Sequence, residues 1–245
     1  MTTPFLQTGE NGIHESEVWP GLKLVRGERH ILLEAPGVME ALGSSVYGGG
    51  MTRIKRMVNI YVDKNYRCDD PGKDIEASLK TWGYPVLKTA GLLTAVRLRY
   101  ASVMEEHCGD FAVFCCATAG VSNAARAGMR RTTFPAAASL APGTINLLLA
   151  IDGRLTPGAM VNAVITATEA KTAALGDLGV HDAETGQAAT GTTTDAVVLG
   201  VSQRPDWPLL HSYAGTATDL GGAVGRLVYA AVSESLRCAA AEARP

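Results

Sequence analysis

Apolar positions along the chain form several short runs of the kind that build β-strands. Residues 22–26 and 30–35 are two β-prone runs separated by three turn residues, which predicts a hairpin. Between residues 54 and 62 the apolar side chains alternate with mainly polar ones, which is typical of a strand with one buried face. The uncharged run 111–118 predicts a central strand buried on both faces. We expect further strands at residues 92–100, 144–151 and 196–201.

Three segments show helical features instead. Asp70 and the proline after it predict the start of a short helix, and Thr156 followed by Pro157 predicts an N-cap with proline at the first helical position. In that second helix the side chains expected to face the sheet are Val161, Val164, Ile165, Thr168, Thr172 and Leu175. Thr216 and Asp219 resemble a capping box before a long C-terminal helix, whose expected buried stripe is Leu220, Val224, Leu227, Val228, Ala231, Val232, Ser235 and Leu236.

These elements predict a single α/β or α+β domain over residues 21–245, with helices packed on a mixed β-sheet and residues 1–20 as a loose N-terminal arm. A chain of 245 residues with 47% hydrophobic content can bury a large core, which excludes a disordered protein. The net charge of −2 lacks the basic excess of nucleic-acid-binding proteins. A homo-oligomer remains open.

The expected compartment is the cytoplasm. The five cysteines show no CxxC spacing, so we interpret them as thiols in a reducing compartment. Residues 1–20 show no signal peptide, and prolines interrupt the longest charge-free stretch, so we expect no membrane-spanning helix. The five histidines are scattered and form no HxH or HExxH motif, which argues against a structural zinc site.

Four polar clusters that contain glycine lie where a predicted element begins or ends, the usual place for sites in α/β proteins. They are SSVYGGG at 44–50, TAGVSNAARAG at 118–128, GTIN at 143–146 and ATGTTTD at 189–195. An ordinary turn is the alternative for each cluster. None has the GxxxxGK[ST] or GxGxxG spacing, so a nucleotide-phosphate site has weak support.

Two segments carry candidate acid–base groups. In TEAK at 168–171, Glu169 is expected at the edge of the apolar stripe as a general base acting on water, and Lys171 near the opposite edge as a stabiliser of negative charge. Two solvated charges are the alternative. Asp195 follows four threonines and would orient the scissile amide or the water, with Thr190 and Thr192 as partners, unless it only forms an Asx turn. One of the two acids would then protonate the leaving amine.

Taken in order, GTIN, TEAK and ATGTTTD, supported by TAGVSNA at 118–124, YGGG at 47–50 and Asn59, resemble the adenosylcobinamide amidohydrolase (CbiZ-type) family over residues 41–201. This chain has Thr193 where the family pattern TGTGTD has its middle glycine.

The resemblance implies hydrolysis of the amide between the corrin ring and its aminopropanol arm, giving adenosylcobyric acid and 1-amino-2-propanol in corrinoid salvage. The cobalt belongs to the substrate, so no cofactor is required, although a divalent metal is not excluded. The implied catalytic residues are Glu169, Lys171 and Asp195. Glycines at 48–50 would let the backbone approach a large, flat corrinoid. The full expected substrate-binding set is Ser45, Gly48, Gly49, Gly50, Asn59, Ser122, Asn123, Thr144, Asn146, Thr190 and Thr192.

Two other functions remain open. A corrinoid-binding or carrier protein would use the same cleft and leave the aminopropanol amide intact. An acyltransferase or self-processing hydrolase with a threonine nucleophile is suggested by Gly143 and Thr144, and it would show a chain cut before Thr144.

Overall fold

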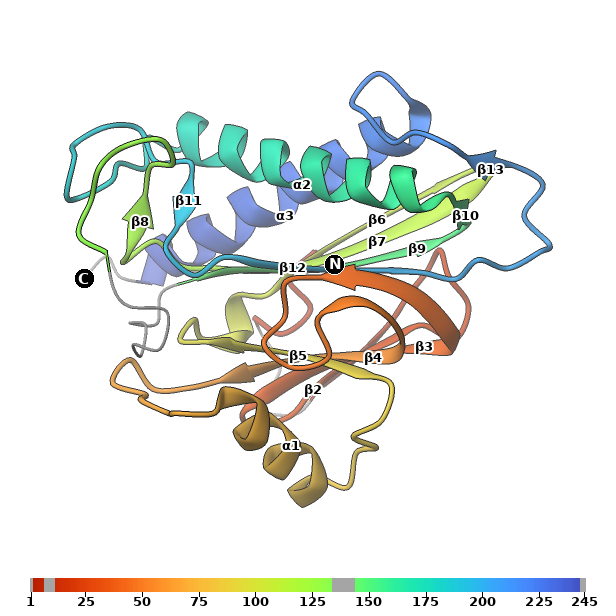
Figure 1. Ribbon diagram of the computed structural model, residues 1–245, viewed down its shortest axis with the longest axis horizontal. Helices are drawn as coiled ribbons and strands as arrows, with labels where there is room; N and C mark the ends of the chain where they lie inside the picture. Colours follow the sequence, from red (N-terminus) through yellow and green to blue (C-terminus); the bar gives the residue numbers. More distant parts are fainter. Residues whose placement is uncertain (1, 7–11, 134–143, 243–245) are drawn as a thin grey trace.

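The computed structural model describes residues 2–6, 12–133 and 144–242 and shows four layers (Figure 1). Helices α2 (Pro157–Asp177) and α3 (Asp219–Glu242) cover one half of a curled mixed sheet, and α1 (Pro71–Thr81) lies below the other half. The upper half contains β6 (Ser102–Cys108), β7 (Phe111–Ala119), β9 (Ile145–Asp152) and β12 (Ala196–Val201). The lower half contains β1 (Gly12–Glu15), β2 (Lys23–Arg26), β3 (His30–Gly43), β4 (Gly50–Tyr61) and β5 (Thr89–Thr94). Short strands β8 (Ala124–Ala125), β10 (Arg154–Leu155), β11 (Gly191–Thr192) and β13 (Leu210–His211) form two small additional sheets.

Strand β3 joins the two halves. Its first part pairs with β2 and β4, and its last four residues pair with β12 as well as β4. The register shifts between Glu34 and Met39, where the strand contains Pro36 and Gly37. Such irregularities bend a strand, so β3 can belong to both layers. One core therefore lies between the two halves of the sheet, and it includes Leu33, Ile54, Phe114 and Leu148.

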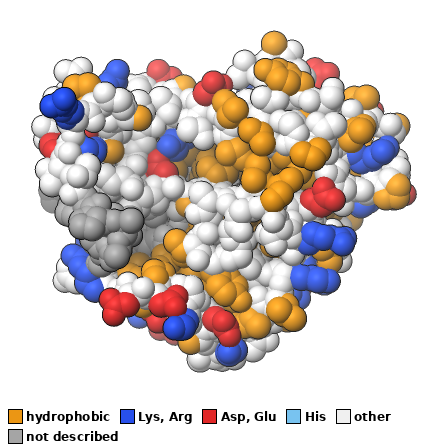
Figure 2. Space-filling model, in the orientation of Figure 1, with side chains coloured by type: hydrophobic (Ala, Val, Ile, Leu, Met, Phe, Trp, Pro, Cys, Tyr) orange, Lys and Arg blue, Asp and Glu red, His pale blue; other side chains and the backbone are white. Residues whose placement is uncertain are grey.

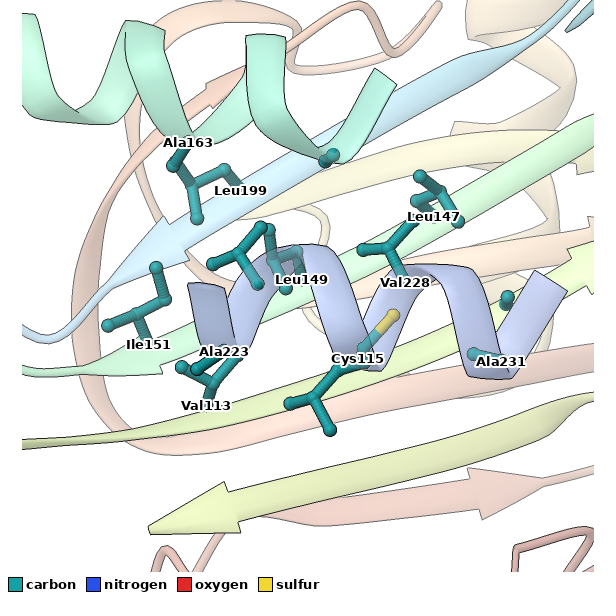
Figure 3. Close-up of a cluster of buried hydrophobic side chains, with 14 of the residues drawn as sticks. Val113, Cys115, Leu147, Leu149, Ile151, Ala163, Leu199, Ala223, Val228 and Ala231 are labelled. Carbon is teal, nitrogen blue, oxygen red and sulfur yellow. The ribbon is translucent and has the colours of Figure 1, made fainter. Parts of the chain in front are cut away.

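A second core lies between the upper half of the sheet and the two long helices (Figure 3). Val113 and Cys115 of β7 belong to this core, while Phe114 and Cys116 belong to the core between the sheet halves. Successive side chains of a strand point to opposite faces, so β7 is buried on both. β7 also lies between β6 and β9, which confirms the predicted central, two-sided strand.

Helix α2 faces the sheet with small side chains rather than with the predicted branched ones. Val161 and Ile165 are 49% and 48% exposed, and apolar side chains gather on this face of the molecule (Figure 2). The buried residues of α2 are Ala159, Met160, Ala163, Thr166, Ala167, Lys171, Ala174 and Leu175, of which only Leu175 belongs to the predicted stripe. Alanines allow α2 to lie close to its neighbours. The predicted stripe was therefore wrong for Val161, Ile165 and Thr168, which are exposed, whereas Leu175 is buried and Val164 packs against the core. In α3, by contrast, all eight predicted stripe residues are buried.

Other differences are local. The described part of the N-terminal arm is packed rather than loose, because β1 pairs with β2 and both Phe5 and Trp19 are buried in the core. The strand expected over 92–100 ends at Thr94 and gives way to a short 3₁₀ turn, and β6 was not predicted. Thr218, rather than Thr216, accepts the capping hydrogen bond at the start of α3. Among the described helices, none has the length and apolar character needed to cross a membrane.

Candidate functional site

Three of the four polar clusters meet at one edge of the upper sheet. β9 and β12 are parallel and begin side by side, with Asn146 opposite Ala196. β7 is antiparallel to β9 and ends there, with Ala119 opposite Ile145. The segments TAGVSNA, GTIN and ATGTTTD therefore converge through sheet register alone. Gly143 of GTIN lies outside the described residues.

Asp195 is the centre of this cluster. Its Oδ1 accepts hydrogen bonds from the backbone N–H of Ile145 at 3.0 Å and from the Thr192 hydroxyl at 2.5 Å. Its Oδ2 accepts from the Thr192 N–H at 3.0 Å and from the Lys171 ammonium at 2.5 Å. A carboxylate offers about four lone-pair sites, so these four donors occupy it fully. Asp195 is therefore arranged to hold other groups in place rather than to accept a proton from water.

Lys171 reaches Asp195 from the buried face of α2. The side chains of Lys171 and Asp195 are only 9% and 14% exposed, so water screens their ion pair weakly. Gly191 permits this approach, because a Cβ at that position would lie 2.4 Å from Asp195 Oδ2 and 2.7 Å from Lys171 Nζ. The pair joins the TEAK segment to ATGTTTD, and the bond from Ile145 joins GTIN to both.

A chain of buried amides connects this cluster to the lower half of the sheet. The Asn146 side-chain amide donates to Asn59 Oδ1 at 2.8 Å and to the Leu93 carbonyl at 2.9 Å. Asn59 Nδ2 in turn donates to the Thr118 hydroxyl at 2.8 Å. Asn59, Thr118 and Asn146 are each about 1% exposed. Since buried polar groups are costly unless they are paired, this network fixes the two halves of the sheet against each other at the candidate site.

Thr144 lies between the amide chain and the acidic loop. Its hydroxyl is 2.6 Å from the Thr194 carbonyl oxygen and 3.3 Å from Asn146 Oδ1. Neither acceptor is basic, so these contacts orient the hydroxyl without removing its proton. The threonine-nucleophile reading stays a prediction, since the residue before Thr144 is outside the described part of the chain.

The threonine-rich loop is held by the segment that contains Asn123. The Asn123 amide donates to the Thr193 hydroxyl at 2.7 Å, and the Thr193 N–H donates back to the Asn123 carbonyl at 3.3 Å. Thr193 has a negative φ, so the loop adopts its conformation without the glycine of the family pattern. Thr190 also fixes the loop, because its hydroxyl accepts from Ala127 N–H and its carbonyl accepts from the Thr172 hydroxyl.

Glu169 does not join the other candidate catalytic residues. Two residues of an α-helix are separated by about 200°, so Glu169 lies on the exposed side of α2 while Lys171 is buried. No contact between Glu169 and Asp195 is found in the described structure. The expected division of acid and base work between these two carboxylates is therefore not supported by their positions. Ser122 is exposed on the loop that follows β7.

The glycine cluster lies beside the same edge of the sheet. The Ser44 N–H donates to the carbonyl of Val197 at 3.0 Å, and Val197 lies two residues after Asp195 in the chain. A Cβ at Gly48 would lie 2.5 Å from the Thr89 carbonyl oxygen, and one at Gly49 would lie 2.3 Å from the Ser45 carbonyl oxygen. The protein's own backbone thus accounts for these two glycines. A Cβ at Gly50 would meet nothing within 4 Å, but its φ of 81° lies in the left-handed region that favours glycine. Substrate contact by the loop stays a prediction.

Two polar residues of the site were missed by sequence reasoning. Thr118 accepts from Asn59, and Thr172 fixes the threonine-rich loop. Thr118 could have been found as the first residue of TAGVSNA, but nothing in the sequence indicates its partner. Within the described residues, no group of three or more His, Cys, Asp or Glu side chains could hold a metal ion.

Comparison with known proteins identifies relatives along most of the chain. Residues 16–243 match the family model CbiZ, described as adenosylcobinamide amidohydrolase. An adenosylcobinamide amidohydrolase of Methanosarcina mazei is 32% identical over 208 residues, covering 82% of this chain and 91% of the relative. One of Halobacterium salinarum is 35% identical over 207 residues, covering 83% and 82%. A solved structure, the PH0078 protein from Pyrococcus horikoshii, aligns over 93% of this chain and 83% of its own, at 10% identity and a TM-score of 0.45.

Proposed function

Since the chain belongs to the adenosylcobinamide amidohydrolase family, we propose that it hydrolyses the amide that joins the aminopropanol arm to the corrin ring of adenosylcobinamide. The products are adenosylcobyric acid and 1-amino-2-propanol, and the reaction serves corrinoid salvage. The observation that carries the proposal is the Lys171–Asp195 ion pair of 2.5 Å, which joins two of the family-like segments, TEAK and ATGTTTD. The hydrogen bond from Ile145 to Asp195 adds the third, GTIN. The cobalt enters with the substrate.

The chemical part of the proposal assigns different tasks to the two charged groups. Amide hydrolysis places negative charge on the carbonyl oxygen as the tetrahedral intermediate forms. Lys171 is the group we assign to that oxygen, because its ammonium is held in place before the substrate arrives and donates N–H bonds without reorganising. Asp195 is a positioning residue, since its four acceptor sites are filled by Lys171, Thr192 and Ile145.

The amide chain formed by Asn59 and Asn146 supports the site from below. Its hydrogen bonds hold the start of β9 against β4 and β5, so the Ile145 N–H stays directed at Asp195. A site held within a fraction of an ångström by such supporting contacts is preorganised for the transition state. We assign these two asparagines to support of the site, because both are buried and hydrogen-bonded within the protein.

The test is incubation of the purified protein with adenosylcobinamide, followed by mass spectrometry of the small molecules. We expect adenosylcobyric acid and 1-amino-2-propanol in equal amounts. A carrier protein would return the amide intact, and that result would refute the enzyme assignment. The intact mass of the protein, measured in the same experiment, shows whether the chain is cut before Thr144.

A matched pair of variants in α2 tests the assignment of the charged groups. Lys171→Met removes the buried ammonium, and we expect turnover to fall by about 10²–10³-fold, the usual cost of one oxyanion donor. Glu169→Gln alters the neighbouring exposed carboxylate. If Glu169 were the general base, this variant would lower turnover by about 10²–10⁴-fold. Because Glu169 is exposed, we expect turnover near that of the parent instead. If only Glu169→Gln is impaired, the roles of the two residues are reversed.

A further inference from the structure

A cavity of about 600 Å³ lies beside the candidate site. Of the residues that line it, only Ser122 belongs to the substrate-binding set expected from the sequence. Its walls come from the ends of β4 and β7, from the segment after β5 and from the last turns of α3. Sites for small ligands usually measure about 300–1,000 Å³, so the cavity has the volume of a binding site.

Three strands connect this cavity to the candidate site. Tyr61 lines the cavity and lies two residues after Asn59 in β4, on the same face of the strand. Gly120 lines it at the end of β7, and its N–H donates to the Thr144 carbonyl at 3.1 Å. Ala95 lines it two residues after Leu93, whose carbonyl binds Asn146. A ligand in the cavity is therefore adjacent to the buried amides and to Thr144.

The lining combines flat, apolar and small side chains. Val96 and Tyr100 line the cavity and are only 8% and 7% exposed. Ala119, Gly120 and Ala239 also line it, and their small side chains leave space for a ligand. Aromatic and aliphatic walls with small residues between them suit a broad, flat, partly apolar ligand.

The charged side chains of the lining balance one another. They are Asp63, Lys64, Arg97 and Glu242, two of each sign, and Arg97 is paired with Glu242 at 3.4 Å. A site for a phosphate or another anion would carry an excess of positive charge. Balanced charge instead suits uncharged groups that both donate and accept hydrogen bonds, such as the carboxamides on the edge of a corrin ring.

We propose that this cavity is the subsite that binds the corrin macrocycle, by its carboxamide-bearing edge, while the adjacent cluster receives the aminopropanol amide. The inference rests on the proposed function, because the corrinoid is the substrate named there. It assigns Tyr61, Val96, Tyr100 and Ala239 to substrate binding, none of which the sequence motifs contain.

A second, larger cavity provides a matched control. It measures about 690 Å³ and is lined by residues of β13, of the start of α3 and of the segment between them, which contains Tyr213 and Ala217. Helix α3 has 24 residues and begins at this cavity and ends at the other one. At 1.5 Å per residue, the two cavities lie about 35 Å apart along the helix. The same change, alanine to tryptophan, can therefore be made in each.

The experiment measures binding of dicyanocobinamide by its visible absorbance after ultrafiltration, together with kcat and KM for adenosylcobinamide. Ala239→Trp fills the cavity beside the site, and we expect Kd and KM to rise at least about tenfold with a much smaller change in kcat, since uniform binding is lost. Ala217→Trp should bind as the parent does. If Ala239→Trp proves poorly folded by circular dichroism, Ser122→Trp replaces it, because Ser122 is exposed and lines the same cavity.

The outcomes separate this inference from the proposed function. Parent-like Kd and KM in the folded tryptophan variants at 239 and 122 would overturn the subsite, even if the enzyme hydrolyses its substrate normally. Weaker binding in Ala217→Trp than in Ala239→Trp would place the macrocycle in the 690 Å³ cavity and also overturn it. A parent protein that binds cobinamide at the 600 Å³ cavity without cleaving adenosylcobinamide would support the subsite and refute the hydrolase.

Discussion

Replacement of Asp195 by asparagine should destabilise the protein as well as inactivate it. The carboxylate accepts four hydrogen bonds, and an asparagine side chain keeps only one of the two acceptor oxygens. The amide oxygen is favoured toward the Lys171 ammonium, so the two donors that lose their acceptor are the Ile145 N–H and the Thr192 hydroxyl. Hydrogen bonds to charged groups contribute about 1.5–3 kcal/mol each, so the expected loss is about 3–6 kcal/mol.

The cost of leaving Lys171 without its partner has a similar magnitude. Removing one member of a buried ion pair typically costs about 3–5 kcal/mol, because the other charge is left without compensation. For a chain of 245 residues, a Tm change of about 2–4 °C per kcal/mol translates this into a Tm lower by about 6–20 °C. Differential scanning calorimetry or thermal circular dichroism measures that shift.

Two further variants decide whether the ion pair is responsible. In Lys171→Met/Asp195→Asn the unpaired charge is gone, so the double variant should be less destabilised than the sum of the two single variants. Glu76→Gln is the matched control, because the Lys80–Glu76 pair has the same 2.5 Å separation with side chains 64% and 40% exposed. Solvent screens that pair, and its loss should leave Tm nearly unchanged. An Asp195→Asn variant with the parent Tm, or strictly additive single variants, would refute the reasoning.

Three more expectations follow from the contacts. Gly191→Ala should lower turnover sharply because the added methyl group separates the site's ion pair, whereas Gly176→Ala, with nothing within 4 Å, should keep parent kinetics. Burial lowers the pKa of His30 below 6.5, so the unfolded chain takes up its proton first as pH falls. The free energy of unfolding, measured by urea titration, should therefore be highest above pH 6.5 and should decrease as the pH falls below 6.5. The variant His30→Phe should show a smaller decrease. Burial raises the pKa of Cys116 to about 12 and also raises that of Cys115, so native alkylation followed by mass spectrometry should spare these two thiols; their modification at the rate of the other three would contradict the buried strand.

Local signals in the sequence predicted most of the elements. Asp70 and Thr156 cap helices as expected, since an N-cap depends on residues within one turn of it. Residues 196–201 form β12 with the predicted bounds, and the run 111–118 forms all of β7 except its last residue. Each of these predictions uses only neighbours along the chain.

The burial pattern of α2 shows where such reasoning fails. Periodicity locates a helix but cannot say whether valines or alanines face the sheet when both occur at helical spacing. Packing of α2 beside α3 on the upper sheet favoured the alanine face, which turned Lys171 inward and left Glu169 in solvent. For that reason Lys171, and not Glu169, contacts Asp195.

The sequence by itself determined the family, the single mixed α/β architecture and the four polar clusters at the ends of elements. Only the tertiary structure decided which clusters meet. Asn59 and Asn146 are 87 residues apart and hydrogen-bond because β3 bends and brings the two halves of the sheet together. Ile145 and Asp195 are 50 residues apart and meet because β9 and β12 are parallel neighbours. Such contacts depend on long-range strand pairing and on the packing of layers, neither of which is encoded in the spacing of a local motif.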